Sequence, residues 1–382
     1  MTHYFTTGNE STCYGCRACE HICPQKAITM KPNEEGFLYP TLDEAICMKC
    51  GLCSQVCPND NVTTVFRKPL KVFAAQYKQQ DVLDNSSSGG IFSAVADYVL
   101  ENNGSVAGCV FDDNFTAIHV VSQDHDTVAK MRGSKYVQSD MENSYSSVKE
   151  DLLTGKKVLF TGTPCQVDGL KSYLGGNTED LYTCDLICHG VPSPKVWSAH
   201  IGFIEKLNKS KLSRYFFRPK DWSWHIHNEK AIFKNGKTFC STGYSNMFRC
   251  LYYSGLIMRP SCYKCQYSDV NRCSDITIAD CRGVDRILSL LNSDEGVSLV
   301  LVNTPRGAEL FSAVAKNTEY YPININDVLQ PPLQHPCVKN RRREEFWNLF
   351  LSKGYTSAIY RIYGRFYNIK YNIKKNIKRV KK

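Results

Sequence analysis

Eight cysteines between residues 13 and 57 constrain this chain more than any other feature of its sequence. Four of them follow the pattern C-x2-C-x2-C-x3-C-P, and the same pattern recurs 34 residues later. Three thiols from one tight loop can each reach a different iron atom of a cubane cluster, so the fourth ligand has to come from elsewhere. The proline that ends each run stops the loop. The eight positions are Cys13, Cys16, Cys19, Cys23, Cys47, Cys50, Cys53 and Cys57.

This spacing is typical of a bacterial ferredoxin domain with two [4Fe–4S] clusters, in which the fourth cysteine of each run ligates the other cluster. Structural zinc is the alternative, but zinc sites usually use two separated C-x2–4-C pairs. The sequence therefore predicts one cluster on Cys13, Cys16, Cys19 and Cys57, and a second cluster on Cys47, Cys50, Cys53 and Cys23.

The composition indicates the compartment. The chain has 382 residues, enough for two or three domains of about 100–200 residues each, and contains 19 cysteines. The N-terminal residues lack the apolar core of a signal peptide, and no run approaches 18 apolar residues. We therefore expect a reduced, cytoplasmic iron–sulfur protein without transmembrane helices or a disulfide framework.

The net charge of +10 comes almost entirely from the C-terminus. Residues 361–382 hold nine Lys or Arg and no acid, so the remainder of the chain is near neutral. The apolar residues of this tail recur at helical spacing, which predicts a basic amphipathic helix. Such a helix suits an anionic membrane surface, an acidic partner or non-specific nucleic-acid binding, and simple packing on the body is the alternative. No specific nucleic-acid site is expected.

Two loops after residue 70 have the composition of anion or nucleotide sites. A predicted strand at 72–77 leads to the segment 85–90 (NSSSGG) and then to a helical pattern. A loop that opens a helix in this way offers backbone amides and the positive end of the helix dipole to a phosphate, although an ordinary N-cap is the alternative. The loop 132–139 (RGSKYVQS) carries two cations, hydroxyls and an aromatic ring, which suits a nucleotide or flavin but also a surface turn.

Cys165 and Cys188 are predicted at the same edge of a sheet. A short buried strand at 156–160 turns through 161–166 (TGTPCQ) into a helix, and the next predicted strand, 181–187, ends at Cys188. Consecutive strands joined by a helix are usually parallel and adjacent, and open α/β sheets bind ligands at the carboxyl ends of their strands. The alternative is that each cysteine is a small buried hydrophobe.

Cys262 and Cys265 form a C-x2-C pair, which is half of a metal site. Cys165 and Cys188 are the economical donors of the other half, and Cys273 and Cys281 are competing candidates. A redox-active C-x2-C is the other interpretation, but that motif normally opens a helix in a βαβ unit.

Residues 214–218 and 231–239 suggest antiparallel structure, with a hairpin signal at Asn235-Gly236. Aromatic and imidazole side chains cluster between the two segments. We interpret them first as packing residues, with contact to a flat cofactor as the alternative. They are Trp222, Trp224, His225 and His227.

The motifs SSSGGIFSA, RGSKYVQS, FTGTPCQVDGLKSYL, DLICHGVPSPKVW, RPSCYKC and SDITIADCRG follow the cysteine runs in that order. With those runs, the chain from about residue 5 to 345 resembles the coenzyme F420 hydrogenase/dehydrogenase beta-subunit family. The resemblance implies an FAD-binding core with one further [4Fe–4S] cluster, ligated by Cys165, Cys188, Cys262 and Cys265. It also implies flavin contacts from Ser88, Gly89, Gly90, Lys135, Tyr136, Thr163 and Gln166. Relatives often carry an aromatic pair where this chain has Cys281-Arg282.

The expected fold is α+β or α/β: a bacterial-ferredoxin-like module followed by a mixed α/β flavin-binding core. The expected division is 1–69 for the ferredoxin module, 70–150 and 151–345 for the two parts of the core, and 346–382 for the basic tail. We expect an oxidoreductase that moves electrons between a hydride donor or acceptor at FAD, such as a reduced deazaflavin or an organic substrate, and the clusters. A non-catalytic electron-transfer adapter is the alternative. An electron carrier or a partner oxidoreductase subunit is the expected partner, and no acid–base catalytic residue is assigned.

Overall fold

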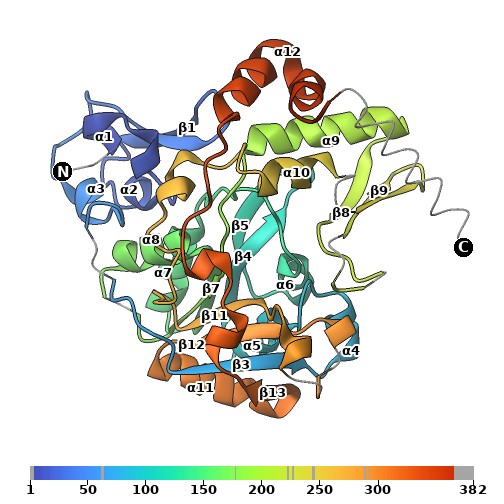
Figure 1. The fold of residues 1–382 in the computed structure, drawn as a ribbon. Coiled ribbons are helices and arrows are strands. Elements are labelled where there is room, and N and C mark those ends of the chain that lie inside the picture. The colour runs from blue at the N-terminus through green and yellow to red at the C-terminus, as the bar shows by residue number, and fades with distance from the viewer. Residues whose placement is uncertain are drawn as a thin grey trace, which may run out of the picture.

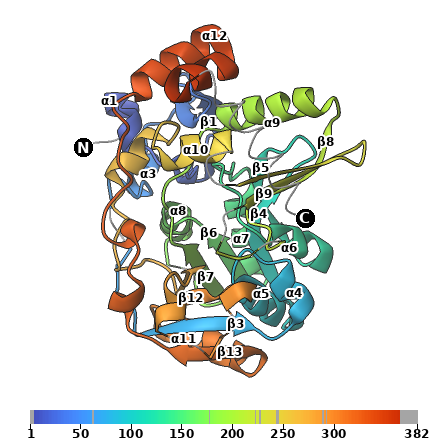
Figure 2. The ribbon, with the colours of Figure 1, turned by 45° about the vertical axis from the view of Figure 1, so that its right-hand side comes forward.

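The computed structural model describes residues 4–61, 64–176, 178–221, 223–225, 228–242, 246–287, 290–291 and 293–364. In this part of the chain, an N-terminal module lies beside a core built on one large mixed sheet, and further helices gather at one end of that core (Figures 1 and 2). No helix in these ranges has both the length and the apolar character needed to cross a bilayer.

The N-terminal module repeats one local structure. Its elements are α1 (Tyr4–Thr7), α2 (Ala18–His21), α3 (Leu52–Gln55) and the antiparallel hairpin of β1 (Ile28–Pro32) and β2 (Leu38–Leu42). The left-handed residues Arg17 (φ 64°) and Gly51 (φ 77°) precede α2 and α3, and they lie 34 positions apart. The repeat in the cysteine spacing is therefore also a repeat in backbone conformation.

The core sheet has eight strands in the order β13-β3-β12-β11-β7-β6-β4-β5. Its centre, from β11 to β4, is parallel, whereas β5, β12, β3 and β13 join antiparallel to their neighbours. The strands are β3 (Lys71–Tyr77), β4 (Ser105–Phe111), β5 (Ala117–Ser122), β6 (Val158–Gly162), β7 (Leu181–Leu186), β11 (Ile276–Asp280), β12 (Ser298–Val302) and β13 (Thr318–Pro322). Every residue of β6 and β12 is buried, as expected for strands covered on both faces.

Helices cover both faces of this sheet. On one face, α5 (Ile91–Glu101), α6 (His125–Met131) and α11 (Pro305–Val314) pack in a core with Leu159 and Val300. On the other face, α7 (Ser144–Leu153) and α8 (Pro164–Leu174) pack with Val158 and Phe160, and Cys16 of the N-terminal module joins the same core. The short helix α4 (Gln80–Asp84) follows β3.

A second core lies at one end of the molecule, where α9, α10 and α12 gather (Figures 1 and 2). Trp197, Phe248 and Phe346 are buried there. Its elements are α9 (Pro194–Asn208), the antiparallel strands β8 (Leu212–Phe216), β9 (Asn228–Phe233) and β10 (Thr238–Thr242), α10 (Met247–Tyr253) and α12 (Arg343–Tyr363).

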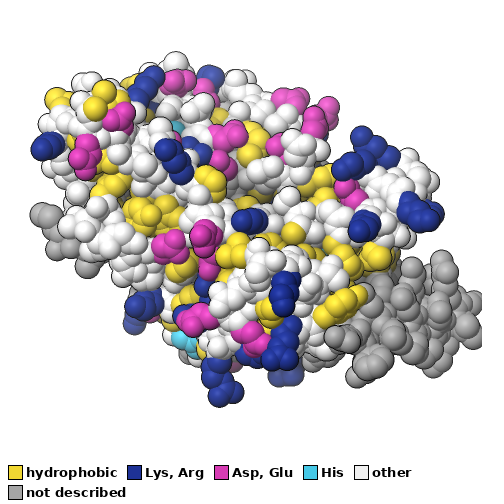
Figure 3. Space-filling model, turned by 90° about the horizontal axis from the view of Figure 1, so that it is seen from above, with side chains coloured by type: hydrophobic (Ala, Val, Ile, Leu, Met, Phe, Trp, Pro, Cys, Tyr) yellow, Lys and Arg dark blue, Asp and Glu magenta, His cyan; other side chains and the backbone are white. Residues whose placement is uncertain are grey.

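The first part of the predicted C-terminal tail belongs to the helix α12. Residues 346–363 belong to α12 and contribute buried side chains to the second core, and the backbone of α12 is non-helical at Gly354 (φ 79°). The remainder of the predicted basic amphipathic tail, 365–382, lies outside the described residues. Acidic and basic side chains are interspersed over the face in Figure 3, in keeping with a near-neutral body.

The module is docked on the core through close backbone contacts. A Cβ on Gly36 would lie 2.5 Å from Cβ of Lys195, and a Cβ on Gly169 of α8 would lie 2.9 Å from Sγ of Cys16. Arg343 of α12 donates to the Glu35 carboxylate at 2.7 Å. The first and last parts of the described chain are therefore joined by a buried ion pair.

The mixed α/β core with an N-terminal ferredoxin-like module is the fold class expected from the sequence. The predicted strands at 72–77 and 181–187 are present within about one residue of their expected bounds, and the strand predicted at 156–160 lies two residues later, as β6. The hairpin at Gly236 (φ 78°) joins β9 to β10. The sequence analysis did not predict α7, α9, α10 or α12.

Candidate electron-transfer site

The first predicted cluster set surrounds one hollow in the N-terminal module. Tyr14, Gly15 and Pro58 also line this hollow, which has an empty volume of about 410 Å³. Gly15 has φ 71°, and a Cβ there would lie 2.8 Å from Nη1 of Arg259, so both backbone conformation and space require glycine. We call these four thiols the inner set: Cys13, Cys16, Cys19 and Cys57.

The second predicted set lies toward the surface. Cys50 is exposed, and Ile46 and Met48 beside it are 49% and 60% exposed. The Lys49 amide donates to Sγ of Cys47 at 3.4 Å, and the Ala27 amide donates to Sγ of Cys23 at 3.3 Å. We call these four thiols the outer set: Cys23, Cys47, Cys50 and Cys53.

The third predicted set surrounds a hollow in the core, with an empty volume of about 450 Å³. Cys165 is the second residue of α8, directly after β6, and Cys188 follows the parallel strand β7. The other two come from the 3₁₀ turn Pro260–Lys264 and its C-cap. The hollow resembles that of the inner set in size and in its four thiols. We call these the core set: Cys165, Cys188, Cys262 and Cys265.

The two competing cysteines do not line the core hollow. Cys273 is buried close to it, in the hydrophobic cluster against which Cys165 and Cys265 pack, and donates to the Pro164 carbonyl at 3.5 Å. Cys281 is fully buried in a different hydrophobic cluster with Leu299. A further thiol contacts the backbone of the core set: Cys337 donates to the Cys262 carbonyl at 3.5 Å.

Burial decides the protonation of these thiols in the metal-free chain. Burial raises the pKa of Cys57 to about 11 and that of Cys188 to about 12. It also raises the pKa of Cys165 and Cys262 well above the ordinary value. Iron binds thiolates, so metal must displace these protons. In the described ranges no three His, Cys, Asp or Glu side chains converge on a single ion, whereas the two hollows each offer four separated thiols, an arrangement that suits a cluster.

Tyr14 separates the inner set from the core set, because it lines both hollows. Its ring lies 5.4 Å from the ring of Tyr267, which also lines the core hollow. Burial, followed by the nearby thiols of Cys265, Cys165 and Cys57, raises the pKa of Tyr14. The two hollows are therefore neighbours across a single side chain.

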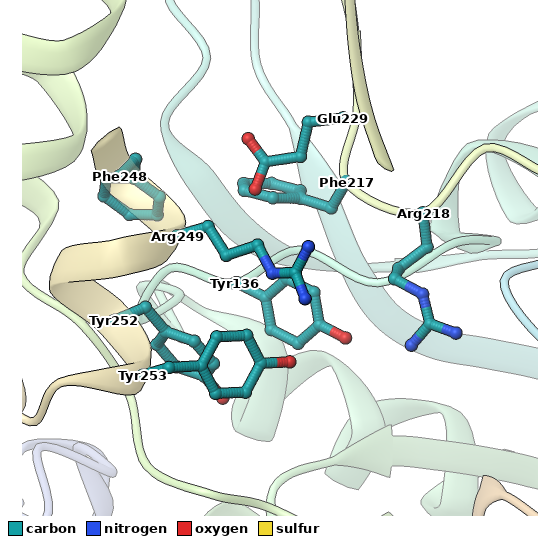
Figure 4. Close-up of a pocket in the computed structure, with 8 residues that line it drawn as sticks. All are labelled: Tyr136, Phe217, Arg218, Glu229, Phe248, Arg249, Tyr252 and Tyr253. Carbon is teal, nitrogen blue, oxygen red and sulfur yellow. The ribbon is translucent and has the colours of Figure 1, made fainter. Parts of the chain in front are cut away.

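Aromatic and arginine side chains line a further pocket (Figure 4). Tyr136 and Tyr253 turn their hydroxyl groups toward the side on which the Arg218 guanidinium lies. We call it the aromatic pocket, and its lining is Tyr136, Phe217, Arg218, Glu229, Phe248, Arg249, Tyr252 and Tyr253. The sequence analysis identified only Tyr136 of this group, because the others come from β9, α10 and the segment after β8, which carry no motif.

His189 connects this pocket with the core set. It follows Cys188 directly and lines the core hollow. Its ring lies 5.4 Å from the ring of Tyr252 and 5.8 Å from that of Tyr253. His189 and Tyr253 also line a more open groove near His335. A continuous set of side chains thus runs from the inner set to the aromatic pocket.

The structure brings the two predicted flavin loops together. The Ser134 amide donates to Oγ of Ser87 at 2.9 Å, and Nε of Arg132 donates to Oγ of Ser93 at 3.0 Å. Gly90 is the N-cap of α5 and contributes no side-chain cap.

Ser88 and Gly89 are anchored to the sheet. Ser88 Oγ donates to the Val297 carbonyl at 2.9 Å, and the Gly89 amide donates to Oγ of Ser298 at 2.9 Å. A Cβ on Gly89 would lie 2.2 Å from the Ala75 carbonyl oxygen, so the loop lies directly on β3.

Three other predicted flavin residues have structural contacts of their own. The ammonium of Lys135 donates to carbonyls at the C-terminus of α6, including that of Met131 at 3.1 Å. Thr163 and Gln166 form a capping box on α8. Thr163 Oγ1 also lies 3.2 Å from Sγ of Cys165. Of the predicted tryptophan and histidine cluster, Trp224 donates to the Ser87 carbonyl at 3.2 Å, and Trp222 and His227 lie outside the described residues.

Comparison with known proteins agrees with this arrangement. Residues 72–145 match the model for the N-terminal part of the coenzyme F420 hydrogenase/dehydrogenase beta subunit, and residues 155–327 match the model for its C-terminal part. The chain belongs to this beta-subunit family. Residues 12–61 match a 4Fe-4S dicluster domain. The chain is therefore an iron–sulfur electron-transfer protein of an oxidoreductase family.

Among solved structures, a chain of the F420-reducing [NiFe] hydrogenase complex from Methanosarcina barkeri is similar at 20% identity and a TM-score of 0.47. The match covers 69% of this chain and 85% of that chain. No curated protein matches.

Glu229 gives this family member a pH-dependent stability. It is buried beside the aromatic pocket, where Tyr215 and Asn246 donate hydrogen bonds to it. Burial raises the pKa of the Glu229 carboxyl from 4.5 to about 7, against the opposing effect of these hydrogen bonds. Between these pH values the folded state keeps a proton that the unfolded state has released, so stability falls as pH rises through this window.

Glu229→Gln is expected to remove that slope. At pH 8 the variant should be more stable than the wild type by up to about 3 kcal/mol, and near pH 4.5 the two should be equal. Glu345→Gln is the control, because Arg342 and Arg361 lower the pKa of Glu345 to about 2, below the window. Thermal unfolding midpoints from pH 5 to 8 measure the difference, and parallel curves for wild type and Glu229→Gln would contradict the prediction.

Proposed function

We propose that the chain is an iron–sulfur flavoprotein oxidoreductase. It moves electrons between a hydride donor or acceptor at FAD, either a reduced F420-like deazaflavin or an organic substrate, and [4Fe–4S] clusters of ferredoxin type. The observation that carries the proposal is the position of the core set between the inner set and the aromatic pocket. Tyr14 lines both the core hollow and the inner hollow, and His189 of the core hollow contacts Tyr252 of the aromatic pocket. The proposed cluster ligands are the inner, outer and core sets defined above.

The residues present fit a long cofactor with an anionic end. At one end, the N-terminus of α5 and the adjoining loops combine backbone amides, the hydroxyls of Ser87 and Ser93, and the Arg132 guanidinium. At the other end, Tyr136 follows the same loop and enters the aromatic pocket. We propose that Ser87, Arg132 and Ser134 hold the diphosphate and that Tyr136 contacts the ring. When bound, FAD supplies the exchange between a two-electron hydride and single electrons.

The chain's own residues fix the geometry around the core set. The capping box of Thr163 and Gln166 sets the first turn of α8 and so the position of Cys165. The Val191 amide donates to Sγ of Cys262 at 3.4 Å, and hydrogen bonds of this kind tune the potential of a cluster. Thr163 and Gln166 therefore act on the core set in this proposal, and Lys135 acts by capping α6.

The alternative is a non-catalytic adapter that delivers electrons to a partner enzyme. The exposed apolar residues Ile46 and Met48 beside the outer set suit contact with an electron carrier or a partner subunit in either case. We keep the division into a ferredoxin module (1–69), a two-part core (70–150 and 151–345) and a tail as part of the proposal, and the matched ranges 12–61, 72–145 and 155–327 support it.

The deciding experiment is cofactor analysis of anaerobically purified full-length protein. Iron, acid-labile sulfide and acid-released flavin are measured per chain. About twelve irons and one FAD are expected from three cubane clusters and one flavin. About eight irons without flavin, even after reconstitution with iron, sulfide and FAD, would overturn both the core cluster and the flavin and leave the adapter. About twelve irons without flavin would keep the cluster sets and overturn only the flavoprotein.

A further inference from the structure

Arg259 lies between the inner set and the core set. Its side chain is fully buried, at 0% exposed. Nε donates to the Cys13 carbonyl at 2.7 Å, Nη2 lies 3.4 Å from Sγ of Cys13, and Nη1 donates to Oε1 of Gln138 at 3.0 Å. Arg259 also lines the core hollow, three residues before Cys262.

No carboxylate pairs with this guanidinium within 4 Å in the part of the chain that the structure describes. The other deeply buried arginines differ: Arg272 pairs with Asp185, Arg218 with Asp280 and Arg343 with Glu35. A buried charge without a partner costs several kcal/mol, so a fully buried arginine implies a compensating negative charge. The groups beside Arg259 that become anionic when they ligate iron are the Cys13 thiol, whose Sγ lies 3.4 Å from Nη2, and the thiols of the core hollow, which Arg259 also lines.

The guanidinium is held so that it stays between the two sets. Its centre lies 4.2 Å from the ring centroid of Tyr39, and Nη2 donates to the Leu38 carbonyl at 2.9 Å. Gln138 in turn donates to the Tyr14 carbonyl at 3.1 Å. These hydrogen bonds hold the Arg259 guanidinium in place between the loop at Cys13 and Tyr14 in the module and Gln138 in the core.

We propose that Arg259 is the shared counter-ion of the inner and core clusters and raises the reduction potentials of both. This inference rests on the clusters of the proposed function and needs no flavin. Four thiolates leave a cubane cluster negatively charged, and its reduction adds one electron without making or breaking a bond. A fixed cation in a buried site stabilises the more negative reduced form most. Arg259 is thus a positioning and tuning residue, and it is not a cluster ligand.

The test is an anaerobic redox titration of full-length wild type, Arg259→Gln and Arg259→Lys, with dithionite as reductant and electron paramagnetic resonance as readout. In Arg259→Gln, the reduced-to-oxidised ratio of two clusters at fixed potential should fall about tenfold or more, which for a one-electron couple is about 59 mV. The outer cluster serves as an internal reference and should not move. Arg259→Lys keeps the charge and should stay near the wild type.

Arg343→Gln combined with Glu35→Gln is the matched control. Arg343 is also a buried arginine that joins the module to the core, but it pairs with Glu35, so replacing both partners leaves the net charge unchanged and should leave all potentials unchanged. Full iron content with unchanged potentials in Arg259→Gln would overturn the proposal. If Arg259→Gln fails to hold iron, Arg259→Lys decides: retained clusters at wild-type potentials support the counter-ion, and equal loss of iron shows a purely structural role. Failure of the proposed function would instead appear in the iron and flavin content of the wild type.

Discussion

Replacing Cys188 with alanine is expected to remove about four of about twelve irons and to abolish reduction of a ferredoxin-type acceptor. Cys188 supplies one of four thiols around the core hollow, directly after β7. Three thiols hold a cubane poorly in a buried site, because burial raises the pKa of the remaining thiols and favours their protonated forms. The inner and outer clusters should remain, since their eight ligands lie in the N-terminal module.

Two variants sharpen this experiment. Cys337 is a spare thiol that hydrogen-bonds to the backbone of Cys262, so Cys188→Ala with Cys337→Ala removes a substitute ligand. Cys273→Ala is the control, because Cys273 is a buried thiol that does not line the core hollow. Iron per chain and the rate of acceptor reduction are measured for each. Full iron in the double variant, or loss of iron in the control, would show that the ligand set is misassigned.

The second large effect concerns the ion pair of Arg272 and Asp185. The side chains are 1% and 0% exposed, with Nη2 of Arg272 at 2.9 Å from Oδ2 of Asp185. Oδ1 of Asp185 has no hydrogen-bond partner among the described residues. Arg272→Met is therefore expected to lower the free energy of unfolding by about 3–5 kcal/mol, because it leaves a buried carboxylate without a counter-charge.

The control for this prediction is an exposed pair. Lys211 is 77% exposed and lies 2.9 Å from Glu205, so Lys211→Met should cost less than about 1 kcal/mol. Adding Asp185→Asn to Arg272→Met should restore part of the loss, because the uncompensated charge is then gone. Denaturant midpoints of the anaerobic protein are measured for the wild type and these three variants. Equal midpoints for Arg272→Met and Lys211→Met would refute the prediction.

The sequence predicted more of the cysteine sites than of the pocket beyond them. The inner and outer sets follow from local spacing, which a cubane imposes on any chain that holds it. The core set was reachable because Cys165 and Cys188 follow two parallel strands, and strand ends meet at one edge. The sequence analysis assigned no role to Arg259 or Glu229. The neighbours that make Arg259 important lie more than 100 positions away, and those of Glu229 lie on another element.

The helices that the sequence analysis did not predict also depend on contacts between residues that are distant in sequence. α9 begins at Ser193-Pro194, and a capping serine followed by proline is a helix-start signal that can be recognised in the sequence. The second core against which α9 packs, however, includes residues as distant in sequence as Phe346. Lys135 lies shortly after α6 and donates to the carbonyls at its C-terminus, a contact that its position after a helix explains, and its predicted contact with a flavin stays a prediction.

The tight contacts at Gly15, Gly36 and Gly169 limit how freely this dicluster module can be exchanged. A ferredoxin with the same eight cysteines but a side chain at either of the first two positions would collide with Arg259 or Lys195, and the inner set would lie farther from the core set. Under the proposed function, grafting another module onto this core would therefore preserve the module's clusters and lengthen the electron-transfer distance to the core set. A graft has to match the surface of the core as well as bind the iron.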